Sequence, residues 1–260
     1  MGKFFQGKVA LITGSASGIG RITAQAFARE GANVVVTTGS NIKGAEETVR
    51  LIQAAGGEAS FIQCDVSKAR EVEALIAKTV EHYGSLDFAF NNAGVGPDGV
   101  RIPFVSLAEC PEDIWDRTIN TNLKGVWLCL KYEMQQMLKQ KSGAIVNTSS
   151  VGTVKFDPGF GAYAASKTGV IALTKTAAVE CAASGIRINA ICPGPTAHTG
   201  LSENTSNTNP EGHDKIAQRI PMGRLTQPEE IAAAVLWLCS KDASFITGNA
   251  LSVDGGFTLI

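Results

Sequence analysis

The sequence has little of what marks a protein that binds polyanions or membranes. Its 23 Lys and Arg against 24 Asp and Glu leave a formal net charge of −1, and this balance gives no long-range field to hold nucleic acid or an anionic bilayer. No apolar run approaches the ~18 residues that a membrane span needs. The opening segment, MGKFFQGKVALITG, has too short an apolar stretch for a secretory signal. We therefore expect a cytoplasmic protein whose partner is a small molecule, with no nucleic acid and no membrane.

Closely spaced cysteine pairs are also absent. The six cysteines include no C-x-x-C pair, and each falls in or beside an apolar stretch, at Cys64, Cys110, Cys129, Cys181, Cys192 and Cys239. Zinc sites and small disulfide frameworks depend on paired or regular spacing. The pattern instead predicts buried free thiols in a reducing compartment, and it predicts no metal site.

The sequence does have a regular alternation of short β-rich runs and longer amphipathic ones. Its 260 residues, 44% of them hydrophobic, suffice for a large core, and no linker or repeat divides them, so we expect one domain over 1–260. Strands are expected at 9–13, 33–38, 59–64, 86–90, 144–149, 186–192 and 250–253. Helices are expected at about 19–30, 42–55, 68–83, 112–140, 160–184 and 228–239. Nearly continuous apolar strands separated by helices predict an α/β fold with a doubly wound parallel sheet.

One segment, at about 195–221, interrupts this alternation. It follows a strand end and is rich in Gly, Pro, Ser, Thr and Asn. A long polar loop in a compact domain is more often a lid over a binding site than a domain boundary. We expect a substrate lid there, and a tolerated surface insertion is the open alternative.

A glycine-rich turn follows the first expected strand. It reads Thr13-Gly-Ser-Ala-Ser-Gly-Ile-Gly20 and leads into a helical run. A strand that turns through glycines into a helix start presents bare N–H groups and the positive end of the helix dipole, which suit a pyrophosphate. Gly14 would allow the tight turn, Gly18 the approach of the backbone to the ligand, and Gly20 the packing of helix on sheet. Three residues, rather than one, separate the first two glycines.

Five ordered motifs resemble those of one enzyme family, the short-chain dehydrogenases/reductases. The turn is similar to their T-G-x-x-x-G-x-G, and Pro193-Gly194 is similar to the pair that closes their sixth strand. The other three motifs are Asn91-Asn92-Ala93-Gly94, Asn122-Leu123-Lys124-Gly125 and Tyr163-Ala-Ala-Ser-Lys167. The resemblance implies a Rossmann-type sheet of order 3-2-1-4-5-6-7 in a homotetramer. It also implies an NAD(P)-dependent oxidoreductase that moves a hydride between nicotinamide and a ketone or secondary alcohol.

Tyr163 and Lys167 are the first candidates for catalysis. Residues four apart share a helix face, so the ammonium can lie beneath the phenol. A unit charge ~4 Å away at an effective dielectric of ~20 contributes roughly 4 kcal/mol, which predicts a phenol pKa of about 7. By resemblance, Tyr163 is the general acid/base and Ser150 hydrogen-bonds the reacting oxygen, whereas Ser149 should point elsewhere. The resemblance also implies that Asn122 supports an active-site water and a proton path to Lys167.

The end of the second expected strand bears on the choice between NAD and NADP. In NAD-specific domains an acidic residue there holds the adenosine ribose and repels a 2′-phosphate. Here residues 36–43 read VTTGSNIK, with no arginine, and no carboxylate appears before Glu46. Thr38, Ser40 and Asn41 can all donate hydrogen bonds to a phosphate. We therefore favour NADP(H) over NAD(H).

The remaining cofactor contacts follow from the resemblance. Asp65 and Val66 match a pair that touches the adenine. Either Thr196 or Thr199 contacts the carboxamide or a phosphate, and the sequence leaves that choice open. The full expected set is Gly14, Ser17, Gly18, Ile19, Gly20, Thr38, Ser40, Asn41, Asp65, Val66, Asn91, Ala93, Gly94, Tyr163, Lys167, Pro193, Gly194, Thr196 and Thr199.

The substrate side of the expected site is partly apolar. The segment after Gly94 (95–104) and the lid (196–221) are expected to shape the pocket. The expected contacts are Gly96, Phe104, Ser150, Phe156, Phe160 and Tyr163. Such a lining favours a hydrophobic or cyclic ketone or alcohol over a highly charged one.

Three other functions remain to be weighed. A non-catalytic NAD(P)-binding sensor would have a broken Ser/Tyr/Lys set, and here the set is intact. An epimerase or dehydratase of the longer subgroup would need a carboxy-terminal substrate domain, for which too few residues follow Asp254. A 3-oxoacyl-carrier-protein reductase stays open as the alternative.

Overall fold

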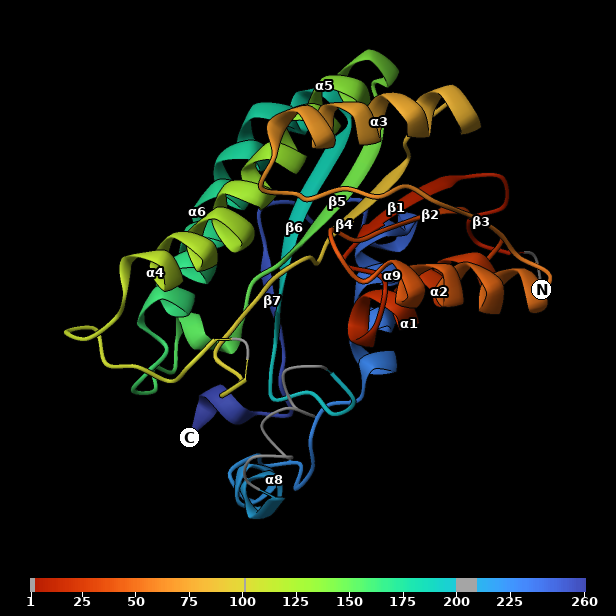
Figure 1. Ribbon diagram of the computed structural model, residues 1–260. Helices are drawn as coiled ribbons and strands as arrows, with labels where there is room; N and C mark the ends of the chain where they lie inside the picture. The colour runs from red at the N-terminus through yellow and green to blue at the C-terminus, as the bar shows by residue number, and fades with distance from the viewer. Residues whose placement is uncertain (1–2, 101, 200–209) are drawn as a thin grey trace.

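Seven parallel strands form one sheet in the order β3-β2-β1-β4-β5-β6-β7, as expected (Figure 1). The computed structural model describes residues 3–100, 102–199 and 210–260. The strands are β1 (Val9–Thr13), β2 (Asn33–Thr37), β3 (Glu58–Phe61), β4 (Phe88–Asn91), β5 (Gly143–Thr148), β6 (Ile186–Pro193) and β7 (Ala250–Val253). Each lies within a few residues of its predicted position. This confirms the doubly wound α/β fold.

The central strands are buried on both faces. All five residues of β1 are buried, and β1 pairs in parallel with β2 from Val9↔Asn33 to Thr13↔Thr37. Successive side chains of a strand point to opposite faces. A strand covered by helices on both sides must therefore be apolar throughout, which is why the strands read as continuous runs rather than as alternating ones.

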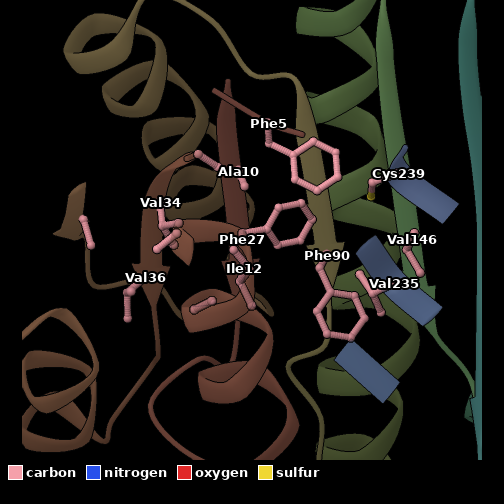
Figure 2. Close-up of a cluster of buried hydrophobic side chains, with 14 of the residues drawn as sticks. Phe5, Ala10, Ile12, Phe27, Val34, Val36, Phe90, Val146, Val235 and Cys239 are labelled. Atoms are coloured by element: carbon pink, nitrogen blue, oxygen red, sulfur yellow. The ribbon is translucent and has the colours of Figure 1, made fainter. Parts of the chain in front are cut away.

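One face of the sheet is covered by α1 (Gly18–Arg29), α2 (Ile42–Ala54) and α9 (Pro228–Cys239). Figure 2 shows the core between this layer and the sheet, where Phe5 and Phe27 lie among small aliphatic side chains. The rings of Phe5 and Phe88 meet edge to face with centroids 4.8 Å apart. Burying one such side chain contributes about 1.5–3 kcal/mol.

The other face is covered by α3 (Ala69–Tyr83), α5 (Gly125–Gln140) and α6 (Gly161–Cys181), and α4 (Glu112–Ile119) packs against α6. The sequence predicted one helix over 112–140. In the structure a π-helical turn at Asn120–Lys124 separates α4 from α5. Such turns add a residue to a helical run and often occur at functional sites.

The segment expected as a lid, 195–221, contains a helix that the sequence analysis did not predict. This helix, α8, spans Pro210–Gln218, and proline is well tolerated in a first helical turn. Residues 200–209 of the expected lid lie outside the described residues. In the part of the chain that is described, no helix is both long and apolar enough to cross a membrane.

Candidate active site

The glycine turn joins β1 to α1 and leaves no room for a side chain at Gly14 or Gly20. Gly14 and Gly18 have φ angles of 64° and 51°, which favour glycine. A Cβ on Gly14 would lie 2.8 Å from the Ala93 Cα, and one on Gly20 would collide with the Gly14 carbonyl oxygen. Ser17 precedes α1 without a side-chain cap. The first N–H groups of α1 are thus free of a side-chain partner from Ser17, and this cradle fits a pyrophosphate.

Thr13 ties the end of β1 to the loop after β4. Its Oγ1 accepts hydrogen bonds from Asn92 N at 2.9 Å and Ala93 N at 3.0 Å, and Asn92 Nδ2 donates to Thr13 O at 3.2 Å. The carboxyl ends of β1 and β4 therefore form one edge of the site. Thr13 and Asn92 stand inside the recognised motifs but were missing from the predicted set. Their side chains act on the backbone, which a motif does not reveal.

Asn91 points away from this edge. Its Nδ2 donates to Glu133 Oε2 at 2.9 Å and to Asn147 Oδ1 at 3.0 Å, both buried. Asn147 continues the chain of contacts to Thr174 Oγ1 at 2.9 Å. The Asn91 side chain is therefore directed to the interior, so the predicted contact of Asn91 with a cofactor would come from its main chain.

Ser150, Tyr163 and Lys167 come together at the carboxyl end of β5. Ser150 follows β5 and lies close enough to the Tyr163 hydroxyl for hydrogen bonding to affect the pKa of Tyr163. The Ser150 Oγ also accepts a hydrogen bond from Gly152 N at 3.0 Å. Lys167 lies beneath Tyr163 on α6, with its Nζ 5.7 Å from the ring centroid. The structure thus brings the three predicted residues together.

Burial dominates the protonation of this group. It raises the pKa of Tyr163 above its usual 10.0, and the smaller effect of Ser150 lowers it. Burial also lowers the pKa of Lys167 from 10.5 to about 8. The upward shift of the Tyr163 pKa is opposite to the expected fall of the phenol pKa to about 7. The Lys167 ammonium donates to Thr148 O at 2.9 Å. At neutral pH the phenol is protonated and the lysine is mostly cationic.

Asn122 lies in the π-helical turn and is fully buried. Its Oδ1 accepts from Val95 N at 2.8 Å, and its Nδ2 donates to Val95 O at 2.8 Å and to Ser166 Oγ at 3.1 Å. A Cβ on Gly94 would lie 3.2 Å from Asn122 Oδ1 and 3.4 Å from Lys167 Nζ. Asn122 therefore fixes the loop after β4 against α6, next to the predicted catalytic lysine.

A buried thiol that the sequence analysis did not place in the site lies behind this group. Cys192 of β6 interacts with the Ser149 and Thr153 side chains and with the charge of Lys167, and burial raises its pKa. Ser149 Oγ donates to Lys167 O at 2.9 Å, so Ser149 points into the protein as expected. Cys192 could have been noticed in the sequence, because it stands directly before the Pro193-Gly194 motif.

The residues that follow β2 and β3 form the part of the site expected to hold the adenosine of the cofactor. Asn41 Oδ1 caps α2 by accepting from Gly44 N at 3.1 Å, while Thr38 and Ser40 stay at the surface or near it. Arg21 reaches this region from α1, donating to Thr48 Oγ1 at 3.0 Å and to Gly44 O at 3.1 Å. The stretch that lacks an arginine in sequence thus has one close by in space.

Asp65 and Val66 differ in what they offer to a cofactor. Asp65 lies beside Gly39, whose added Cβ would be 3.5 Å from the Asp65 Cα, and its Oδ1 accepts from Ser67 N at 3.0 Å. The Val66 side chain is buried in the core. Ile19 likewise packs against the core on the opposite face. Contacts from Val66 and Ile19 to a cofactor would therefore come mainly from their main chains.

The two threonines after β6 are now distinguishable. Thr196 turns back on its own chain, with Oγ1 donating to Gly194 O at 2.8 Å. Thr199 lies across from the glycine turn, where a Cβ on Gly18 would be 3.6 Å from the Thr199 Cα. Gly194 itself packs against Asp254, whose Cα would lie 2.8 Å from an added Cβ. Of the two candidates, Thr199 is the one beside the expected phosphate position.

Aromatic side chains lead away from Tyr163 on the substrate side. Phe160 meets the Tyr163 ring edge to face at 6.0 Å, and Phe104 lies 5.5 Å from Phe160. A small, mainly apolar cavity next to Tyr163 includes Ile102 in its lining. Phe156 is largely exposed and Gly96 is buried, and neither lines this cavity. Of the expected substrate residues, Phe104 and Phe160 are in ring contact with the Tyr163 group.

Comparison with known proteins agrees with this arrangement. A family model described as enoyl-(acyl carrier protein) reductase matches residues 14–258. An uncharacterized oxidoreductase from Thermotoga maritima is 43% identical over 98% of this chain and 99% of its own length. The chain belongs to the short-chain dehydrogenase/reductase family.

Two further similarities place it within that family. The chain is 42% identical to a 3-oxoacyl-[acyl-carrier-protein] reductase from Staphylococcus aureus, with 96% of this chain and 97% of that protein covered. The crystal structure of an NAD⁺-bound xylitol dehydrogenase superposes with a TM-score of 0.90 at 34% identity, covering 97% of this chain and 99% of the other. Like its family, the protein is an NAD(P)-dependent oxidoreductase acting on CH–OH and C=O groups.

Proposed function

We propose that the protein interconverts a hydrophobic ketone and its secondary alcohol, with Tyr163 as the general acid/base. The observation that carries the proposal is the grouping of a protonated phenol, the Ser150 hydroxyl and the Lys167 ammonium at one strand end. In reduction, Tyr163 delivers its proton to the carbonyl oxygen while Ser150 donates a hydrogen bond to that oxygen. A nicotinamide dinucleotide supplies the hydride in this chemistry.

The protonation state of Tyr163 matters in both directions of the reaction. Burial raises the pKa of the phenol and so keeps on it the proton that reduction consumes, whereas oxidation requires the ionised form, which nearby positive charge favours. Lys167, with a pKa of about 8, provides such a charge below that pH. Asn122 holds Gly94 and the Val95 backbone next to this lysine, and we assign it a positioning role.

The cradle at the glycine turn would hold the diphosphate, and Thr199 would close over it. At the adenosine end, the absence of a carboxylate between Thr38 and Lys43 and the Arg21 guanidinium support NADP(H) over NAD(H). Initial rates with the two cofactors at equal low concentration test this preference, and a clear preference for NAD contradicts it.

The aromatic row from Tyr163 through Phe160 to Phe104 supports an apolar or cyclic substrate. The alternative is reduction of a 3-oxoacyl group on a carrier protein, which the similarity to the Staphylococcus aureus reductase supports. Leu107 lines the cavity beside Tyr163. Two acidic residues, Glu112 and Asp113, follow it in the sequence, in the first turn of α4. They would oppose an acidic carrier, so we favour a free substrate.

The assembly expected from the resemblance is a homotetramer, and the sequence pattern predicts that it is cytoplasmic. Exposed apolar side chains on α5 and α6 support an interface, since Trp127 and Val179 keep 46% and 82% of their surface exposed in the single chain. The six cysteines are unpaired and five are buried, which suits a reducing compartment. Light scattering coupled to gel filtration gives the mass, and a monomer would contradict the tetramer.

The deciding experiment is a panel of cyclic and aryl ketones, acetoacetyl thioesters and secondary alcohols, followed at 340 nm with NADPH or NADP. We expect turnover of the apolar ketones and its loss in Tyr163→Phe with cofactor binding retained. Turnover of thioesters alone would favour the carrier-protein alternative. Full activity of Tyr163→Phe would contradict the proposed acid.

A further inference from the structure

The segment Asp254–Ile260, which we call the clasp, follows β7 and folds back toward the site. Asp254 holds it in place: its Oδ1 accepts from Gly256 N at 3.0 Å, and its Oδ2 accepts from Thr258 N at 3.0 Å and Thr258 Oγ1 at 2.7 Å. Gly255 and Gly256, with φ angles of 60° and 87°, allow the reversal. The buried ring of Phe257 is thereby presented at a fixed place.

One side of Phe257 contacts the loop that begins at Ser150. The ring is buried against Val151, and the Lys155 Nζ lies 4.3 Å from the ring centroid. The same ammonium donates to Phe257 O at 3.2 Å and to Ile260 O at 2.9 Å. Lys155 N in turn donates to Val151 O at 2.9 Å. The clasp therefore packs against Val151, the residue next to the predicted catalytic serine.

The other side of Phe257 contacts the chain that follows α8. Ile220 shares the buried cluster with Phe257 and Val151, and the Arg219 guanidinium lies 5.6 Å from the ring centroid. Met222 N donates to Gly255 O at 3.2 Å. Figure 1 shows α8 close to the C-terminal end. Both cations lie over the buried ring, and such cation–π contacts favour keeping their two segments against it.

We propose that Phe257 is a positioning residue that sets the Ser150 loop, which belongs to the proposed active site, against the segment after α8. The ring is the buried contact shared by both segments, and an exposed ion pair between Arg219 and Asp157 at 4.0 Å also joins them. The inference rests on the proposed function for its effect on turnover, but the ordering of the two segments does not. Loss of the ring would displace Ser150 from its approach to Tyr163.

The test compares two phenylalanines of equal burial. Phe257 and Phe5 are 5% and 4% exposed, and Phe5 belongs to the core on the α1 side of the sheet. We expect Phe257→Leu to lower kcat and raise KM for the carbonyl substrate, reducing kcat/KM about tenfold to a hundredfold, because small displacements of a reacting group are costly. NADPH affinity should change less than about twofold, and Phe257→Tyr, which keeps the ring, should restore activity.

Phe5→Leu is the control, because it removes the same buried surface far from the clasp. It should lower the melting temperature by a similar amount while leaving kcat and KM at the wild-type values. Equal kinetic effects of the two variants would reduce Phe257 to an ordinary core residue and overturn the proposal. So would unchanged kinetics in Phe257→Leu.

A second readout does not depend on turnover. Amide hydrogen exchange of the whole protein should rise in 151–157 and in 216–222 for Phe257→Leu, and in neither for Phe5→Leu. If the wild-type protein reduced no carbonyl compound at all, the proposed function would be wrong. The exchange measurement would still show whether Phe257 orders the two segments. Unchanged exchange in both segments would overturn the inference.

Discussion

Asn91 Nδ2 and Glu133 Oε2 are joined by a hydrogen bond of 2.9 Å in the protein interior. Glu133 is fully buried, and burial raises its pKa from 4.5 to about 7. Its second oxygen has no hydrogen-bond partner among the residues that the structure describes. A carboxyl group in this place is stable when it carries a proton and costly when it is charged.

Stability should therefore depend on pH through Glu133. The folded protein binds this proton more tightly than the unfolded chain does. The contribution of protonated Glu133 to the free energy of unfolding is therefore complete below pH ~4.5 and is lost as pH rises through about 7, a decrease of roughly 3 kcal/mol. Glu133→Gln, which keeps the shape and cannot ionise, should remove that decline. Urea unfolding at pH 5 and pH 8 measures it, and an identical pH dependence in both proteins would refute the assignment.

Activity should also respond to the titration of Lys167. Burial lowers its pKa to about 8, so the ammonium is lost as pH rises through that value. We expect kcat/KM for ketone reduction to fall above pH ~8, because this parameter reports ionisations of the free enzyme. A profile that stays flat to pH ~10, where an unperturbed lysine titrates, would contradict a buried lysine in the mechanism.

Ser150→Ala tests the second hydroxyl of the site. It should lower kcat by about a hundredfold or more, since a donor aimed at a developing oxyanion contributes about 3–4 kcal/mol. Cofactor affinity should stay near the wild-type value. Ser149→Ala is the neighbouring control: its hydroxyl bonds Lys167 O, and its loss should affect stability more than the response to substrate. Equal losses of kcat in both variants would contradict the assignment of Ser150.

The glycine turn allows a matched pair of substitutions. Gly14 and Gly7 have similar φ angles, 64° and 70°, so alanine costs each about 1 kcal/mol of backbone strain. Only at Gly14 would the new Cβ meet a neighbour, the Ala93 Cα at 2.8 Å, whereas Gly7 faces open space. We expect Gly14→Ala to raise the cofactor Kd about tenfold or more and Gly7→Ala to leave it unchanged. Fluorescence titration with NADPH measures both.

Thr38→Asp tests the adenosine end. A carboxylate after β2 repels a 2′-phosphate and accepts hydrogen bonds from a ribose, so the ratio of kcat/KM for NAD to that for NADP should rise about tenfold or more. Thr38→Asn is the control, because it has nearly the same shape without the charge. A rise of the same size in both variants would show that shape, rather than charge, selects the cofactor.

The sequence predicted the parts of this protein that depend on local patterns. Continuous apolar strands and ordered motifs were sufficient for the sheet and for the meeting of Ser150, Tyr163 and Lys167. It did not predict what depends on three-dimensional surroundings. The pKa of Tyr163 moves opposite to expectation because burial is not visible in a motif. Arg21 contacts the start of α2 from the neighbouring helix α1. The Asn91 side chain points inward because side chains alternate along a strand.

The π-helical turn at Asn120–Lys124 has a consequence for the angular phase of the helical run. The extra residue of such a turn shifts everything after it by about 100° around the axis. The buried residues of α4 and of α5, such as Thr118 and Val126, therefore follow two different angular phases along one continuous helical run. Deleting Thr121 would remove this offset, so the two helices could no longer both keep the faces that they bury.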